Sequence, residues 1–177
     1  MRNSRVTPKP KAVNIFIIAE QFRLASKLAT LAPLMVDRYP EFEFVRNNHM
    51  LTASMVCAAF SLELYFKCLI RIGHKAYELD HNLERLFQLV GRRSRTQIKR
   101  YFYENDHQVR GYVERQYQGS GRQIPIADLF GFCLAASSRA FVQMRYVFER
   151  GIPPDEGWLG DAIVECARRV ILGQRPN

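Results

Sequence analysis

A long, almost uncharged run in the first half of the chain limits the folds open to this sequence. Residues 48–72 read NHMLTASMVCAAFSLELYFKCLIRI and are apolar on most faces of a helix. Such a helix must be covered on every side, so it belongs at the centre of a bundle. The uncharged stretch before Glu63, residues 50–62, is 13 residues long, short of the roughly 20 that a membrane-spanning helix needs. We therefore expect a core helix and no contact with a membrane.

Other segments have the spacing or the stop signals of helices. Apolar residues three or four apart over residues 14–33 predict an amphipathic helix that Asn14 caps and Pro33 kinks or ends. No segment alternates apolar and polar residues as a half-buried strand does. The fold class that we expect is an all-α, up-and-down bundle of five or six helices. The remaining helices are expected from a cap at Asp80 or Asn82 to a stop at Gly91, and over residues 96–117, 127–149 and 158–172.

Length and composition describe one domain with short extensions. The 177 residues are 47% hydrophobic, which is enough apolar material for a single core. Residues 1–12 contain basic residues and prolines without an acid, so we expect a flexible basic arm before the helical domain. We assign residues 13–173 to that domain and residues 174–177 to a polar tail.

The four cysteines lie far apart, with no CxxC pair and no histidine at zinc-ligand spacing. This favours reduced core thiols, no metal and a cytoplasmic location. No Gly-rich loop of the GxxxxGK type is present either, so no nucleotide cofactor is expected.

The charge balance favours a polyanionic partner. Lys and Arg number 26 against 17 Asp and Glu, which leaves a net charge of +9 and suits nucleic acid. Interleaved tyrosines would supply stacking surfaces for unpaired bases. The same charges also suit a helix face that docks an acidic protein, so both partners remain open. The candidate nucleic-acid contacts are Arg92, Arg93, Arg95, Lys99, Arg110 and Arg115.

Two segments carry a family resemblance. Residues 61–90 read SLELYFKCLIRIGHKAYELDHNLERLFQLV, and residues 140–149 read AFVQMRYVFE. An E-x-x-x-K helix, a loop ending in H-x-L-x-x-L and a helix bearing R-Y-x-x-E together resemble the HEPN superfamily, in particular its stand-alone bacterial branch. The resemblance implies a helical-bundle homodimer that binds RNA. In many members it implies metal-independent RNA cleavage in toxin or defence systems.

One pair matches the spacing of the active members, which carry an arginine followed after four to six residues by a histidine. Their pair lies on a helix near the C-terminal end of the bundle, where this chain has Arg145 and no following histidine. Arg100 and His107 enclose six residues elsewhere, so on a helix both point the same way about 10 Å apart. In such a site His107 would take the 2′-hydroxyl proton while Arg100 held the phosphate. An arginine-rich chain also produces this spacing by chance. Three interpretations of the pair therefore stay open: the site of a ribonuclease, the remnant of such a site in a degenerate relative, or an ordinary exposed helix face.

Four charged residues lie within the apolar stripes of two predicted helices. Glu63 and Lys67 are in line with large apolar residues on the core helix, and Arg145 with Glu149 repeats this on a later helix. Buried charges need partners, so we predict that Glu63 meets Arg145 and that Lys67 meets Glu149 across adjacent helices. Fixing the helix register is the first interpretation of this network, and a ligand pocket is the second. His81 is expected to clamp its loop to a helix.

Overall fold

The computed structural model describes residues 10–31, 49–74, 80–105, 111, 128–150 and 160–174, without the side chains of 49–52 and 140–150. Over these ranges the all-α bundle is confirmed, with six helices and no strand. They are α1 (Ala12–Leu31), α2 (His49–Ile72), α3 (Leu83–Leu89), α4 (Arg92–Glu104), α6 (Leu129–Arg150) and α7 (Gly160–Gln174).

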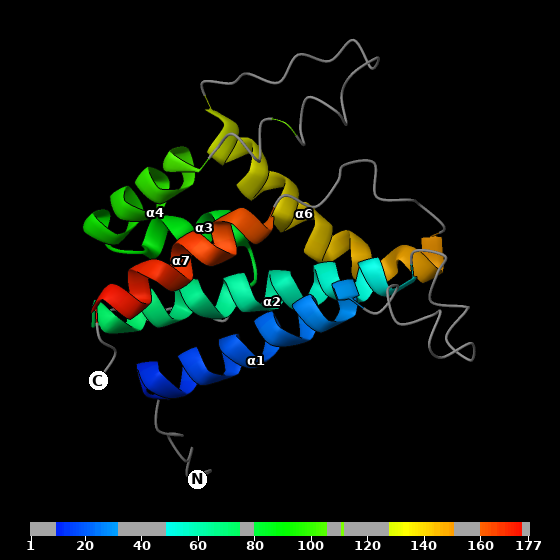
Figure 1. The fold of residues 1–177 in the computed structure, drawn as a ribbon, viewed down its shortest axis with the longest axis horizontal. Coiled ribbons are helices and arrows are strands. Elements are labelled where there is room, and N and C mark those ends of the chain that lie inside the picture. Colours follow the sequence, from blue (N-terminus) through cyan, green and yellow to red (C-terminus); the bar gives the residue numbers. More distant parts are fainter. Residues whose placement is uncertain are drawn as a thin grey trace, which may run out of the picture.

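The central element is α2. Figure 1 shows α1 running beside it, and α3, α6 and α7 pack on its other sides. Leu62, Tyr65 and Phe66 of α2 have no exposed surface. By length and composition Ala53–Ile72 could also cross a membrane, but 72% of that window is buried inside the bundle. The apolar run thus serves as the core helix that the sequence predicts.

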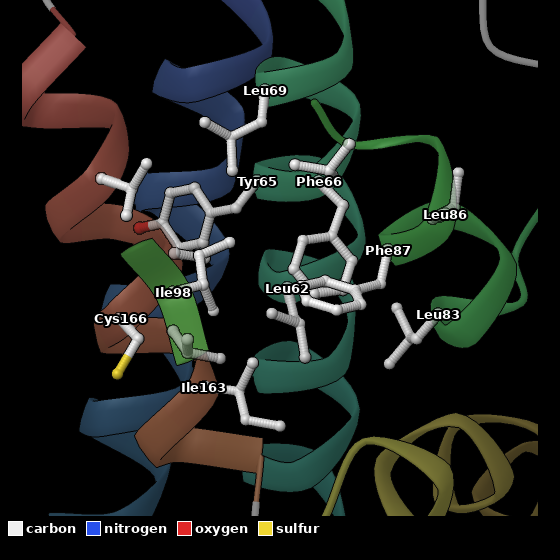
Figure 2. Packing of buried hydrophobic residues seen from close by; sticks show 14 of the residues in the cluster. Leu62, Tyr65, Phe66, Leu69, Leu83, Leu86, Phe87, Ile98, Ile163 and Cys166 are labelled. Atoms are coloured by element: carbon white, nitrogen blue, oxygen red, sulfur yellow. The ribbon is translucent and has the colours of Figure 1, made fainter. Parts of the chain in front are cut away.

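Aromatic rings join α2 to the helices around it. Phe66 of α2 faces Phe87 of α3 (Figure 2), with their ring centroids 5.5 Å apart. Phe87 in turn meets Phe130 of α6 at 5.0 Å. Tyr65 points to another side of α2, toward α7 (Figure 2). Burial of such large rings dominates core energetics, so these contacts hold α3, α6 and α7 on α2.

The predicted start of α1 is wrong. The helix begins at Ala12, and Asn14 lies in its first turn, where its backbone N–H donates to the carbonyl of Lys11 at 3.1 Å. Ala12 is buried, and the Cys68 thiol donates to its carbonyl at 3.4 Å. Packing against α2 therefore lengthens the helix beyond the residue chosen for its capping preference. Pro33 lies outside the described residues.

The boundary between α3 and α4 also differs from the prediction. Asn82 is the N-cap of α3, as one of the two predicted alternatives has it, and its side chain accepts from the Arg85 N–H at 3.0 Å. Val90 is buried and extended and ends α3, and Gly91 is the N-cap residue of α4. The basic segment is therefore helical from Arg92, not from residue 96. The other two helices, α6 and α7, agree with their predicted ranges to within two residues.

Candidate functional site

The outer face of α4 is basic. Its buried side chains, Ser94, Ile98 and Phe102, follow one another every four residues and face the core. On a helix with 3.6 residues per turn, positions 93, 96, 100 and 103 then form the opposite stripe, with 92 and 99 beside it. This exposed stripe carries four cations. They are Arg92, Arg93, Lys99 and Arg100, and we call them the basic face.

Little negative charge balances the basic face. The one acid on α4 is Glu104, whose Oε1 lies 3.4 Å from Nε of Arg100, and both side chains are about half exposed. An exposed i,i+4 pair of this kind stabilises a helix only weakly. Among the described residues, Arg92, Arg93 and Lys99 form no ion pair. The face is therefore open to an anionic partner.

Arg95, also predicted to contact nucleic acid, lies apart from the basic face. Its Nη1 donates to Gln88 of α3 at 2.7 Å. Its Nε atom is buried and has no hydrogen-bond partner. The inner part of the Arg95 side chain, up to Nε, therefore packs against α3. Only the outer part of its guanidinium reaches solvent.

The tyrosines of α4 differ in what they offer. Tyr103 is 39% exposed. Tyr101 packs partly on the core, and two guanidinium groups lie over its ring, those of Arg100 at 5.1 Å and of Arg169 in α7 at 4.1 Å from the centroid. Cation–π contact of this kind orients both partners. Tyr103 is thus the open stacking surface, whereas Tyr101 is part of a stacked group between α4 and α7.

The proposed catalytic pair is described for one member only. Arg100 is 60% exposed and lies near the C-terminal end of α4. His107 lies outside the described residues, as do Arg110 and Arg115. The juxtaposition of Arg100 with His107 stays a prediction.

Residues from two of the sequence motifs, the E-x-x-x-K helix and the H-x-L-x-x-L loop, meet in one cluster. Glu63 and Lys67 are 3% and 7% exposed, and Lys67 Nζ donates to Glu63 Oε1 at 2.6 Å. Nδ1 of His81, in the loop before α3, lies 3.1 Å from both carboxylate oxygens of Glu63. His81 thereby clamps that loop to α2. We call these three residues the Glu63 cluster.

The predicted partners on α6 are Arg145 and Glu149, whose side chains lie outside those described. The structure brings Glu63 and Lys67 together along one helix, and the predicted contacts of Glu63 with Arg145 and of Lys67 with Glu149 stay predictions. Their i,i+4 spacing is the sequence signal for this direct pair, which on a surface would stabilise a helix only weakly. Burial makes the pair far more consequential than a surface pair of the same spacing.

A second polar network was missed, and it is centred on Glu20. Its carboxylate accepts from the Tyr65 hydroxyl, from Nε of Arg168 at 2.8 Å and from Nη2 of Arg23 at 3.0 Å. Partial burial raises the pKa of Glu20, but these hydrogen bonds outweigh it, and the pKa lies below its ordinary value. Burial and the bond to Glu20 raise the pKa of Tyr65. The network joins α1, α2 and α7, and no local spacing in the sequence predicts it.

A cleft of about 670 Å³ lies between α1, α2, α4 and α7. Its inner lining is apolar and buried, from Ala58, Phe102 and Val164. Charged side chains surround it toward solvent, among them Lys27 and Asp161. We call it the α1–α7 cleft. It is assembled from four helices, so no single segment of the sequence marks it.

The outer face of α1 is apolar. Five large aliphatic side chains on it are between 45% and 68% exposed. Positions 17, 24 and 31 are seven apart, and position 28 lies between two of them, which is the spacing of a coiled-coil seam. Exposed apolar patches of this kind mark interaction surfaces. The five residues are Ile17, Ile18, Leu24, Leu28 and Leu31, and we call them the α1 stripe.

Comparisons with known proteins add no family to these observations. No family model matches the chain, and neither a curated protein nor a solved structure does. Within the described ranges, no group of three or more His, Cys, Asp or Glu side chains is placed to hold a metal ion. The basic face, the clusters and the cleft are therefore the features that bear on function.

Proposed function

We propose that the protein binds RNA through the basic face of α4. The observation that carries the proposal is the set of four exposed cations on one side of a 13-residue helix that has a single acid. Three of the four are arginines, whose planar donor forks suit phosphate oxygens. A helix of this length is about 20 Å long, the distance of about six phosphates along one duplex strand. Several phosphates can therefore contact the face at once.

RNA is favoured over other polyanions by two further features. Tyr103 lies within the stripe and is exposed, so an unpaired base can stack on it beside the phosphate contacts. The resemblance to the HEPN superfamily, which the Glu63 cluster and its flanking motifs carry, also implies RNA as the ligand. The alternative partner, an acidic protein, would use the same cations without Tyr103 stacking on a base.

Cleavage is the second part of the proposal, in a metal-independent ribonuclease or a degenerate relative of one. In that reaction His107 takes the proton of a 2′-hydroxyl, the 2′-oxygen attacks the adjacent phosphorus, and the 5′-oxygen leaves. Arg100 stabilises the charge that develops on the phosphate oxygens. The support for cleavage is the position of Arg100 at the end of the basic face. There its guanidinium would leave Glu104 and bind a phosphate.

We also propose that a second copy of the chain covers the α1 stripe. A seven-residue spacing of apolar residues is self-complementary, because each copy presents the same seam to the other. Ten positions of α1 are exposed, residues 14, 17, 18, 21, 24, 25, 27, 28, 30 and 31, and the one charge among them, on Lys27, is paired with Glu165 of α7 at 2.9 Å. Two copies of a chain with a net charge of +9 can therefore approach along this face. The homodimer that the resemblance implies would form here.

RNA binding is tested by fluorescence anisotropy with a labelled RNA at two salt concentrations. The triple variant R92A/R93A/K99A removes three cations of the basic face. The matched control K11A/R85A/R139A removes three exposed cations outside it. We expect the first variant to lose at least tenfold in affinity and to lower the salt slope by nearly three, because each phosphate contact contributes about one. The control should keep most of the affinity and the slope.

Equal losses in the two triple variants would show that net charge alone attracts RNA and would contradict the proposal. Absence of RNA binding by the wild type would favour the acidic partner, whose binding weakens with salt while RNA has no effect. Cleavage is followed on the same RNA in EDTA, where H107A and R100A should each abolish it. Binding without cleavage would leave an RNA-binding bundle without a ribonuclease site.

A further inference from the structure

The α1–α7 cleft lies next to the basic face. Tyr101 and Asn105 of α4 line the cleft, and their neighbour Arg100 belongs to the basic face. The guanidinium of Arg100 lies 5.1 Å from the ring centroid of Tyr101, so these two residues join the face to the cleft. A strand whose phosphates lie along α4 therefore passes the mouth of the cleft.

The lining suits a planar group with polar edges. Ala58, Phe102 and Val164 supply an apolar interior. Asn105 places an amide in the lining, and an amide offers both a donor and an acceptor to a base edge. The Asn105 side chain is already oriented, because its Nδ2 donates to the Tyr101 carbonyl at 2.9 Å. The volume of about 670 Å³ lies within the range of small-ligand pockets.

The cations on the α1 side of the cleft do not make it a phosphate site. Glu165 of α7 lies 3.3 Å from Nη1 of Arg23 and 2.9 Å from Nζ of Lys27. Arg23 is also paired with Glu20, with Nη2 3.0 Å from Oε2, so both cations on this side have carboxylate partners within the chain. The basic face therefore binds phosphates better than the cleft does. The cleft suits the base, the part of a nucleotide that carries no charge.

We infer that the α1–α7 cleft receives one unstacked base of the RNA that α4 binds. The inference rests on the proposed function. A base inside a duplex is paired and stacked, and it must leave the stack before it can enter a pocket. The protein should therefore bind single strands and loops more tightly than duplex RNA of the same length.

The probe is a short RNA with one 2-aminopurine, used as a single strand and as a blunt duplex. Two variants fill the cleft from opposite walls, Ala162→Trp on α7 and Thr30→Trp on α1. The matched control is Leu172→Trp, which adds the same side chain at an exposed position of α7 that does not line the cleft. Thermal melts followed by circular dichroism establish which variants are folded. The readouts are affinity and the change in 2-aminopurine fluorescence.

For the wild type we expect about tenfold tighter binding of the single strand, since one base–protein stack contributes on that order. A162W and T30W should each lower this preference and the fluorescence change, with duplex affinity retained, and the preference that remains should be that of a base stacked on exposed Tyr103. L172W should behave as the wild type. A preference and a fluorescence change that both stay at the wild-type level in either folded cleft variant overturn the inference. If R92A/R93A/K99A binds both RNAs as tightly as the wild type, the proposed function fails instead.

Discussion

The hydroxyl of Tyr65 on α2 donates to a carboxylate oxygen of Glu20 on α1, and the same oxygen accepts from Nε of Arg168 on α7 at 2.8 Å. Tyr65 has no exposed surface, so its hydroxyl cannot exchange this bond for water. One carboxylate thus links three helices that flank the α1–α7 cleft. The stability of the bundle and the shape of the cleft depend on it together.

Glu20→Gln should lower the free energy of unfolding by about 2 kcal/mol, because hydrogen bonds to a charged group contribute more than neutral ones. Tyr65→Phe removes one of these bonds and should cost about 1 kcal/mol. The matched control is Glu165→Gln, whose exposed ion pairs should contribute less than about 1 kcal/mol. Urea unfolding measures all three. Equal losses for Glu20→Gln and Glu165→Gln would contradict the central role of Glu20.

The same carboxylate predicts an acid sensitivity. Its folded-state pKa lies below the ordinary value of 4.5, so it stabilises the fold above pH 4.5. That contribution declines as the pH falls below 4.5 and through the folded-state pKa. The stability difference between the wild type and Glu20→Gln should therefore shrink between pH 6 and pH 3 in thermal melts. A difference that is constant over this range would show that Glu20 acts without its charge.

The Glu63 cluster predicts a large effect from one neutral substitution. Lys67→Met leaves the buried Glu63 carboxylate without its lysine, which should cost about 3 to 5 kcal/mol. The double variant E63Q/K67M should lose less than the sum of its single variants, because the pair is coupled. Arg100→Met breaks the exposed pair of the same spacing with Glu104 and should cost under about 1 kcal/mol. Similar losses for Lys67→Met and Arg100→Met would show that burial does not strengthen the pair.

The thiols should react in a defined order. Burial raises the pKa of Cys68 and Cys133 to about 12 and of Cys166 to about 11. Cys57 is only partly buried, although burial raises its pKa as well. In the folded protein at pH 8, a thiol reagent should therefore modify Cys57 first, and Cys57→Ser should remove that fast phase. A fast phase that persists in Cys57→Ser would place the accessible thiol elsewhere.

Self-association is tested on the α1 stripe. The double variant L24E/L28E places two like charges in each copy of the seam, so the dimer should dissociate in sedimentation experiments. Leu172→Glu adds a charge at an exposed apolar position of α7 and should leave the dimer intact. A wild type that sediments as a monomer at all concentrations would contradict the homodimer proposal.

Periodicity and composition predicted the elements of this fold well, because the apolar run of α2 can only be buried. Element ends were less predictable, since tertiary contacts decide them. The Ala12 carbonyl is bound by Cys68, from a distant part of the chain, and this contact extends α1 past Asn14. Buried Val90 ends α3 in the same way and leaves Gly91 to open α4.

The candidate site was predictable where it lies on one helix. The basic face follows from charge and helical spacing within α4. Glu20 and Arg168, in contrast, are 148 positions apart, and no local pattern connects them. The α1–α7 cleft is also invisible to local patterns, because side chains from α1, α2, α4 and α7 line it.

The two-residue junction between α3 and α4 has a consequence for recognition. Val90 is held in the core, and Ser94 at the start of α4 accepts from Gln174 at the end of α7 at 2.9 Å. The backbone of α4 therefore has little freedom left to lose when a ligand arrives. Association then orders only the outer side chains, at about 0.5 to 1.5 kcal/mol each. A strand would meet side chains that project from a fixed backbone, and the spacing of their Cα atoms selects the ligands that fit it.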